Sequence, residues 1–548
     1  MKKVLRSKRA FPLGLTILLT FTLVCGFATM GFAGELIRGD AIYADYTNKG
    51  AVHGGTWRTS WATIRSLDPH IETAAATTSF CNITYNGLLR LRQDMLGVEL
   101  DAARSWKQID DLTYEFKLHK GVYFHDIPPV NGREMTSADV KYSIERISGL
   151  HGKKARFTHR YYFGDKFESI ETPDKYTIIF KTKKPYAPFI NYIASAWTKI
   201  VPREAVEAWG DLRTKACGTG PFVLKEYIKG SHHTFVKHTK FFKKGLPYMD
   251  GIDIRIMPRP ATFLAAFLAG KLDSQGLYHF QVPTIQKEDP TAKVFEAPGC
   301  YTRIVRTPPW IEGKVPLKPP FDNKKVRQAI AHAIDKVKLL KLAWDGKGQV
   351  QIGHVPLPYK PWGLPQKDLW EFNPEKAKKL LAEAGYANGF SSELMTWNLP
   401  YMTGPSQVIQ QMLKDVGINI TINALDFSQY FNKTYRFKYE MAFHITTAGY
   451  DPEEWLVPYF GRLGSSTYYK WSNPELWDMI EKQAYIMDKR KRTAYIHDIQ
   501  RKVLDEAMSQ TMFTTNRYWA RKPYANAKWY FHPSSGYSPC EEWWMEKH

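Results

Sequence analysis

The chain has 548 residues, too many for one hydrophobic core, so two or three lobes are expected. Hydrophobic residues make up 44% and charged residues 24%, a balance that excludes an intrinsically disordered chain. The formal net charge of +22 would suit an anionic partner. However, the longest basic run, Lys489–Arg492, lies in a polar helical segment typical of a solvated helix face, so no nucleic-acid partner is expected.

The first 33 residues have the features of a targeting signal. Basic residues precede an apolar run from Phe11 to Phe27, and Gly31-Phe32-Ala33 fits a small-x-small cleavage site. The sequence therefore predicts a signal peptide over residues 1–33 and export of the rest. The apolar run is long, and retention as a membrane anchor is the alternative.

The four cysteines after this segment do not form a C-x-x-C pair. They are Cys81, Cys217, Cys300 and Cys540, and they are far apart in the sequence. An oxidising compartment permits one or two disulfides, whose pairing the sequence does not define, and buried thiols are the equal alternative.

Further along the chain, a strand begins near Gly54 and a longer strand pattern spans residues 112–118. In the second, Leu112, Tyr114, Phe116 and Leu118 alternate with polar residues, which is the period of a half-buried strand. Thr136 followed by Asp139 then predicts a capping box at the start of a helix. The apolar residues of that helix recur on one face.

Later helices are marked by their capping residues. Asn or Pro start signals stand at Pro202, Pro260, Asn323, Asn373 and Asn473. A strand ending at Trp397, a helix over Ser406–Val416 and a strand over Ile418–Ile422 form a predicted βαβ unit. Ligands of such parallel sheets bind at the carboxyl ends of the strands, so Trp397 is expected to point toward a cleft.

A second strand end carries polar and aromatic residues. The predicted strand Met441–Ile445 runs into Gly449, Tyr450, Asp451 and Trp455. No short motif of the common hydrolases, zinc sites or dinucleotide-binding folds occurs in the sequence. His232 and His233 are adjacent on a predicted strand and so point to opposite faces. We therefore predict no catalytic residue, no metal site and no cofactor.

Several of these stretches together resemble one protein family. The residues that carry the resemblance are Ser105-Trp106, Asp110-Asp111-Leu112-Thr113-Tyr114, Phe124-His125-Asp126, Asn131-Gly132-Arg133, Gly218-Thr219-Gly220-Pro221 and Val326-Arg327-Gln328-Ala329-Ile330-Ala331. In this order they resemble the extracellular solute-binding proteins, family 5, which serve peptide, nickel and related ABC importers. Ile127 departs from the family pattern, which usually has Gly.

The resemblance implies an α/β, two-lobed periplasmic-binding-protein-like (type II, cluster C) fold with an extra small lobe. The expected boundaries are 34–104 and 206–300 for lobe I, 105–205 for the extra lobe, 301–510 for lobe II and 511–548 for a return to lobe I. The implied function is capture of a small-molecule or peptide ligand in the inter-lobe cleft by hinge closure and its delivery to ABC permease subunits. The implied location is the periplasm, with membrane association only through the permease.

Five residues are predicted to contact the ligand. They are Trp61 from lobe I and Trp397, Tyr450, Asp451 and Trp455 from lobe II. The aromatic rings would stack on the ligand and Asp451 would pair with a cationic group. Peptide-binding relatives have an Asp at the position of Gly449, where it pairs with the α-amino group of the ligand. Its absence argues against ordinary peptide binding.

Two other functions are compatible with a chain of this kind. A secreted hydrolase would need a nucleophile, a base and an orienting group, which a broad hydrolase assay would reveal. A surface adhesion or chaperone-like module on the same fold would bind a macromolecule and show no stabilisation by a small ligand.

Overall fold

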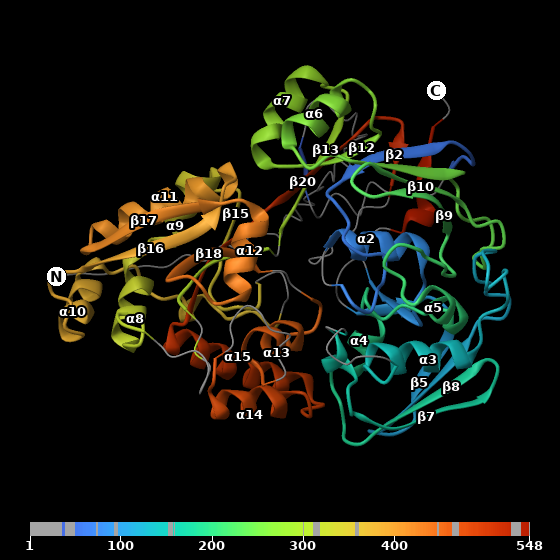
Figure 1. The fold of residues 1–548 in the computed structure, drawn as a ribbon, viewed down its shortest axis with the longest axis horizontal. Helices are drawn as coiled ribbons and strands as arrows, with labels where there is room; N and C mark the ends of the chain where they lie inside the picture. Colours follow the sequence, from blue (N-terminus) through green and yellow to red (C-terminus); the bar gives the residue numbers. More distant parts are fainter. Residues whose placement is uncertain are drawn as a thin grey trace, which may run out of the picture.

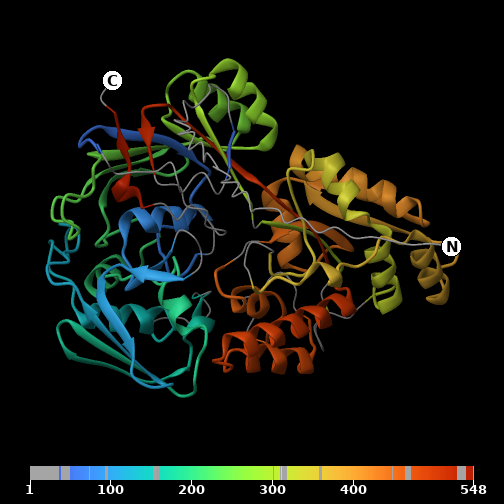
Figure 2. The ribbon, with the colours of Figure 1, turned by 180° about the vertical axis from the view of Figure 1, so that it is seen from behind.

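The molecule consists of two lobes side by side (Figure 1), and the view from behind shows the same division (Figure 2). The computed structural model describes residues 36–38, 50–72, 75–92, 97–151, 157, 159–299, 301–308, 310, 318–356, 361–446, 449–462, 471–527 and 539–546. The predicted signal peptide and Cys300 lie outside these residues. Cys81, Cys217 and Cys540 are buried free thiols.

Two four-stranded sheets form the main part of lobe I. One contains, in spatial order, β1 (Leu36–Arg38), β13 (Lys293–Ala297), β20 (Arg517–Arg521) and β12 (Ser274–Leu277). The other contains β2 (Thr56–Trp61), β11 (Gly251–Ile256), β10 (His232–Lys237) and β9 (Phe222–Ile228). The accompanying helices are α2 (Ala75–Thr84), α5 (Arg203–Trp209), α6 (Pro260–Leu268) and α7 (Val282–Glu288). Two short hairpins complete this part, β3 (Leu89–Leu91) with β4 (Val98–Leu100) and β21 (Ala525–Asn526) with β22 (Trp544–Met545).

The extra small lobe is an antiparallel sheet with helices against it. Its strands, in spatial order, are β5 (Ala103–Gln108), β6 (Thr113–Leu118), β8 (Thr177–Thr182) and β7 (Phe167–Asp174). Its helices are α3 (Ser137–Ile147), the 3-10 turn η2 (Arg160–Tyr162) and α4 (Phe189–Ile193). The predicted capping box of Thr136 and Asp139 is present at the start of α3. The sheet begins at Ala103, just before the expected boundary, and its core is continuous with that of lobe I.

Lobe II is built on a six-stranded mixed sheet. Its strands, in spatial order, are β15 (Gly348–Val350), β19 (Ser509–Thr515), β14 (Thr302–Arg306), β18 (Met441–Thr446), β16 (Phe390–Trp397) and β17 (Ile418–Leu425). The parallel pairing of β16 with β17, joined by α11 (Pro400–Lys414), confirms the predicted βαβ unit. The helix begins earlier than predicted, at Pro400, because proline is accepted in a first helical turn.

Seven other helices surround this sheet. They are α8 (Lys324–Ala333), α9 (Lys336–Trp344), α10 (Pro374–Glu383), α12 (Phe427–Tyr435), α13 (Glu453–Phe460), α14 (Pro474–Gln483) and α15 (Lys489–Glu506). The side chains of Asn323, Asn373 and Asn473 cap α8, α10 and α14, as their positions predicted.

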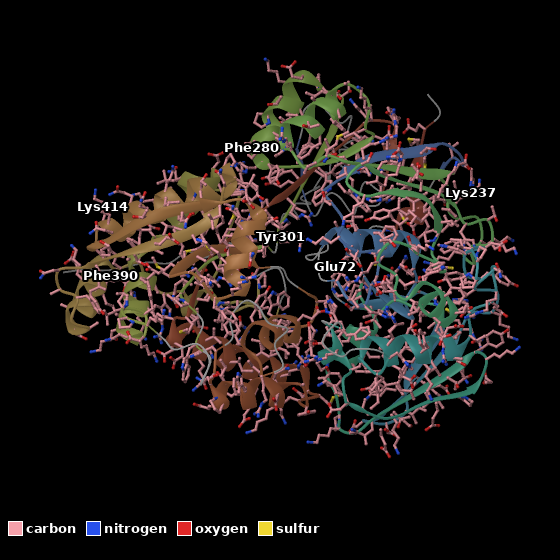
Figure 3. The ribbon with its side chains drawn as sticks, viewed as in Figure 1. Glu72, Lys237, Phe280, Tyr301, Phe390 and Lys414 are labelled. Atoms are coloured by element: carbon pink, nitrogen blue, oxygen red, sulfur yellow. The ribbon has the colours of Figure 1, made fainter. Side chains whose placement is uncertain are left out.

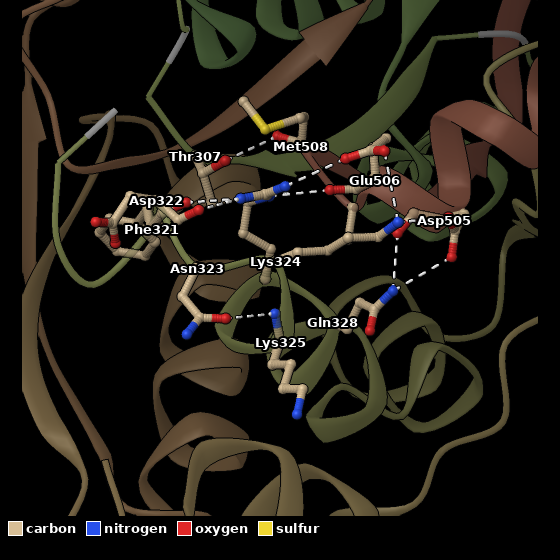
Figure 4. A network of polar contacts seen from close by, with 12 residues as sticks. Thr307, Phe321, Asp322, Asn323, Lys324, Lys325, Gln328, Asp505, Glu506 and Met508 are labelled. Atoms are coloured by element: carbon tan, nitrogen blue, oxygen red, sulfur yellow. Dashed lines mark hydrogen bonds and ion pairs between the residues drawn. The ribbon is translucent and has the colours of Figure 1, made fainter. Parts of the chain in front are cut away.

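A polar network ties the end of α15 to the start of α8 (Figure 4). The buried Arg327 guanidinium donates to the carbonyl oxygens of Phe321 and Glu506, each at 2.9 Å. Lys324 Nζ reaches Asp505 Oδ2 at 2.5 Å. Since α15 runs directly into β19, this network positions the strand that leaves lobe II.

The chain crosses between the lobes on neighbouring strands. β13 of lobe I leads into β14 of lobe II, and β19 of lobe II leads through Asn516 into β20 of lobe I. β13 pairs antiparallel with β20, and β14 pairs antiparallel with β19. The boundary expected at residue 511 is therefore corrected to Asn516, because β19 belongs to the lobe II sheet through Thr515.

Side by side, the two crossings form a hinge region. A Cβ atom on Gly299 would lie 1.7 Å from the carbonyl oxygen of Thr515, so only glycine allows the crossings to approach this closely. A pair of adjacent strand crossings permits lobe rotation by small backbone changes at few residues.

Candidate functional site

The carboxyl ends of the parallel lobe II strands β16, β17 and β18 face the region between the lobes, where α12 lies opposite α2 (Figure 1). Trp397, the last residue of β16, is 8% exposed. Its ring packs against three rings of α12, with centroids 5.2 Å from Phe427, 5.5 Å from Tyr430 and 5.5 Å from Phe431. Its indole N–H has no hydrogen-bond partner in the described part of the chain. Trp397 thus forms, with the rings of α12, an aromatic wall held by packing, and its indole N–H donor has no partner among the described residues.

Phe427 extends this aromatic wall toward lobe I. Asp426 caps α12 by accepting from the backbone N–H of Gln429, which starts the helix at Phe427. The Phe427 ring is 45% exposed, and the guanidinium of Arg65 from lobe I lies 5.5 Å from its centroid. This cation–π contact joins the two lobes across the site.

Lobe I contributes Trp61 at the end of β2. Its backbone oxygen accepts from the N–H of Met257 at 3.0 Å, and its half-buried side chain packs against the lobe I core. Arg65 follows in the loop after this strand, and Glu72 and Tyr301 lie near the space between the lobes (Figure 3). Trp61 and Trp397 therefore stand on opposite lobes.

Asp451 lies in a fully buried ion pair rather than on an open surface. Its two carboxylate oxygens accept from the Arg492 guanidinium at 2.6 and 2.9 Å, and both side chains are at most 4% exposed. The same carboxylate accepts from Asn191 Nδ2 of the extra small lobe at 2.9 Å and from the Glu453 N–H at 2.9 Å. The cationic partner that we expected in a ligand is supplied here by Arg492. The role of Asp451 in this structure is to hold the loop after β18.

Trp455 and Tyr450 also have different environments. Trp455 is 1% exposed and belongs to the core that α13, α14 and α15 share with lobe I. It therefore presents no free ring face in this structure, in contrast to the stacking role that the sequence suggested. Tyr450 is half-buried, and its N–H donates to the carboxylate of Glu454.

The carboxylate of Glu454 also lies against Gly449. A Cβ atom at this position would lie 1.6 Å from Glu454 Oε2, so a side chain here would require the Glu454 side chain to move. Glu454 therefore brings a carboxylate into the space beside Gly449 from the next helix.

Sequence reasoning missed Glu453 and Glu454, which bind lobe II to the extra small lobe. The hydroxyl of Tyr162 donates to Glu454, and the hydroxyl of Tyr186 donates to Glu453 at 3.4 Å. Burial raises the pKa of both carboxyls to about 7. The backbone N–H of Ala187 also donates across the interface, to the carbonyl oxygen of Ala484, at 2.8 Å. The only sequence signal was the position of two acids after a predicted strand end.

A second contact between the lobes lies beside the hinge. The rings of Tyr278 in lobe I and Tyr401 in lobe II stack with centroids 5.2 Å apart. His279 packs against Trp344 of α9 at 4.9 Å, and its Nε2 is 3.5 Å from Asp345. Lobe II therefore contacts the rest of the molecule both beside the hinge and at the extra small lobe.

Within the described ranges, no group of three or more His, Cys, Asp or Glu side chains is placed to hold a metal ion. None of the described helices combines the length and hydrophobicity needed to cross a bilayer. His125 accordingly has a packing role, since its Nε2 lies 3.1 Å from the carbonyl oxygen of Gly220 and burial lowers its pKa to about 3.

Two lobes, adjacent strand crossings and an aromatic wall at the inter-lobe edge of a sheet define a hinged solute-binding protein. The chain belongs to the bacterial extracellular solute-binding proteins, family 5, whose model matches residues 97–467. It is the solute-binding component of an ABC importer, and it delivers its ligand to the permease subunits.

Individual relatives agree with this assignment. The glutathione-binding protein GsiB of Pectobacterium atrosepticum is 31% identical over 376 residues, which cover 67% of this chain and 68% of that protein. GsiB of Escherichia coli K12 is 28% identical over 374 residues, 66% of this chain and 68% of that protein. The periplasmic binding protein DppA from Helicobacter pylori, in complex with the peptide STSA, superimposes with a TM-score of 0.77 at 23% identity, covering 90% of this chain and 99% of that one. This last similarity confirms the fold.

Proposed function

We propose that the protein captures a small, peptide-like organic solute between Trp61 and Arg65 of lobe I and Trp397, Phe427 and Tyr450 of lobe II. The observation that carries the proposal is the position of Trp397, an aromatic wall with an unused N–H donor at the strand edge that faces the other lobe. The glutathione-binding relatives support a peptide-like solute, because glutathione combines amide, thiol and carboxylate groups.

The mechanism is closure of one lobe onto the other. A solute that contacts both lobes stabilises the closed state by its differential affinity, and the permease then meets a defined surface. Arg65 over Phe427 and Asn191 on Asp451 are contacts that form only when the lobes are together. Asp451 and Trp455 act indirectly, by holding the loop that carries Tyr450. The cycle breaks no covalent bond, and the protein works in the periplasm after export.

Thermal unfolding in the presence of single solutes tests the proposal. Glutathione, the dipeptide Met-Leu and a metabolite panel are added separately, and the radius of gyration is measured by small-angle X-ray scattering. At least one solute should raise Tm and reduce the radius of gyration. Mass spectrometry of the purified protein then shows whether the same class of solute co-purifies. A protein that no small solute stabilises, but that binds a macromolecule, would overturn the proposal in favour of an adhesion or chaperone role.

A further inference from the structure

Arg303 is a buried arginine that has no carboxylate partner within the described part of the chain. It is the second residue of β14, next to the hinge, and is 5% exposed. Its Nη1 donates to the carbonyl oxygen of Tyr301 at 2.9 Å, and its guanidinium carbon lies 4.9 Å from the centroid of the Trp344 ring. Its Nε has no acceptor among the residues that the structure describes. Burial lowers its pKa to about 10, and only tyrosines oppose that shift.

Two other buried arginines, Arg146 and Arg492, differ in this respect. Arg146 pairs with Asp68 at 2.5 Å, and Arg492 pairs with Asp451 at 2.6 Å. These two arginines are 3% exposed, close to the 5% of Arg303. Burying a charge without a partner costs on the order of several kcal/mol, because the charge loses its hydration. Natural proteins therefore rarely retain such a charge without a compensating group. The partner of Arg303 therefore lies outside the described residues.

A second donor without a partner lies against the same guanidinium. Trp344 is 3% exposed, and its indole N–H has no acceptor among the described residues. The two side chains are in direct cation–π contact, so two unused N–H donors belong to one cluster. The cluster contains aromatic rings and one cation. The nearby carboxylate of Asp345 contacts His279 rather than Arg303.

The cluster lies at the junction of the lobes. Trp344, Tyr401 and Arg303 belong to lobe II, whereas Tyr278 and His279, which pack against them, belong to lobe I. Opening of the hinge would remove the two lobe I side chains and uncover Arg303 to an entering solute. Closure would then desolvate the resulting ion pair, which strengthens it.

We propose that Arg303, with the Trp344 N–H, receives an anionic group of the transported solute, a carboxylate or a comparable oxyanion, during lobe closure. The inference rests on the proposed function and narrows its solute class to acids. It also places the specificity determinant beside the hinge, on the face of the sheet that α9 covers.

Thermal unfolding with small anions tests this proposal without a known solute. Wild type, Arg303→Gln, Arg303→Lys and the surface control Arg462→Gln, whose arginine is 51% exposed, are unfolded in sodium chloride alone. Acetate or phosphate then replaces part of the chloride at constant ionic strength. Acetate or phosphate should raise the Tm of wild type and Arg462→Gln, raise that of Arg303→Lys less, and leave that of Arg303→Gln unchanged. A response to acetate alone indicates a carboxylate solute, and a response to phosphate alone indicates a phosphorylated one.

Stability in chloride alone separates this role from a structural one. Arg303→Gln should unfold no earlier than wild type, because it removes a buried charge without a carboxylate partner. A lower Tm, an anion response that survives in Arg303→Gln, or a wild type that responds to neither anion overturns the inference.

Solute binding distinguishes failure of the inference from failure of the proposed function. An acid-bearing solute that binds wild type should bind Arg303→Gln at least about tenfold more weakly. A co-purifying solute without an acidic group, or unchanged affinity in Arg303→Gln, overturns the anionic site and leaves solute capture intact. A wild type that closes on no solute overturns the proposed function itself.

Discussion

Replacing Glu453 with glutamine should make thermal stability less dependent on pH between 5 and 8. Glu453 is 3% exposed at the start of α13. It accepts from the Tyr186 hydroxyl of the extra small lobe at 3.4 Å and from Gln483 Nε2 at 3.3 Å. Burial is the main cause of its raised pKa of about 7, and the negative charge of Asp451 adds to it, while Lys166 and Arg492 oppose it. Glutamine keeps the size of the side chain and removes the proton equilibrium.

The magnitude follows from the difference between the two proton affinities. An unfolded glutamate releases its proton above its ordinary pKa of 4.5, whereas the buried Glu453 holds it up to about pH 7. The folded state therefore binds more protons than the unfolded state between these values, and stability falls as pH rises through that window. A pKa of about 7 in place of 4.5 corresponds to a loss of at most about 3 kcal/mol, complete above pH 7.

The assay is Tm measured from pH 5 to pH 8 for wild type, Glu453→Gln and the control Glu375→Gln, whose glutamate is 82% exposed. The advantage of Glu453→Gln over wild type should be small at pH 5 and should grow up to about pH 7.5. Glu375→Gln should follow wild type throughout. A difference between Glu453→Gln and wild type that stays constant from pH 5 to pH 8 would refute the reasoning, because it would mean that Glu453 titrates as it does in the unfolded chain.

Three further substitutions have definite expected outcomes. Asp451→Asn should lower the free energy of unfolding by about 3 to 5 kcal/mol, because it leaves Arg492 buried without its counter-charge; a variant of wild-type stability with lost solute affinity would instead assign the carboxylate to the solute. Gly299→Ala should lower Tm and increase the radius of gyration in scattering, since its Cβ would lie 1.7 Å from the Thr515 oxygen, and an unchanged profile would contradict this account of the hinge. Trp397→Phe should fold normally and weaken solute binding by up to about tenfold, because it removes one N–H donor. Calorimetry measures this affinity, and an unchanged value would place the solute elsewhere.

Local elements followed closely from the sequence. The capping pair Thr136 and Asp139 and the cap at Asn373 are present because such bonds join residues three positions apart, which sequence spacing reveals. Trp397 was placed at a strand end by the apolar pattern before it, and the parallel pairing of β16 with β17 confirms that position. The short local range of these interactions explains the success.

The candidate site was predicted only in part. The placement of aromatic residues at strand ends was correct, but the partners of the charged residues were not apparent. Asp451 and Arg492 are separated by α13 and α14, and nothing in either local pattern indicates that they pair. Trp455 looked equivalent to Trp397 in sequence, yet it became a core residue, because burial depends on which surface α13 packs against.

The sequence by itself determined the family, the order of strands and helices and the presence of a sheet edge rich in aromatic side chains. These properties depend on residue types and spacings along the chain, which periodicity and capping chemistry express directly. Only the tertiary structure decided which charges are neutralised within the chain, as at Asp451. It also decided which charge is left for the solute to neutralise, as we infer for Arg303. The physical reason is that the cost of a charge depends on its surroundings, and those are assembled here from two lobes that lie far apart in sequence.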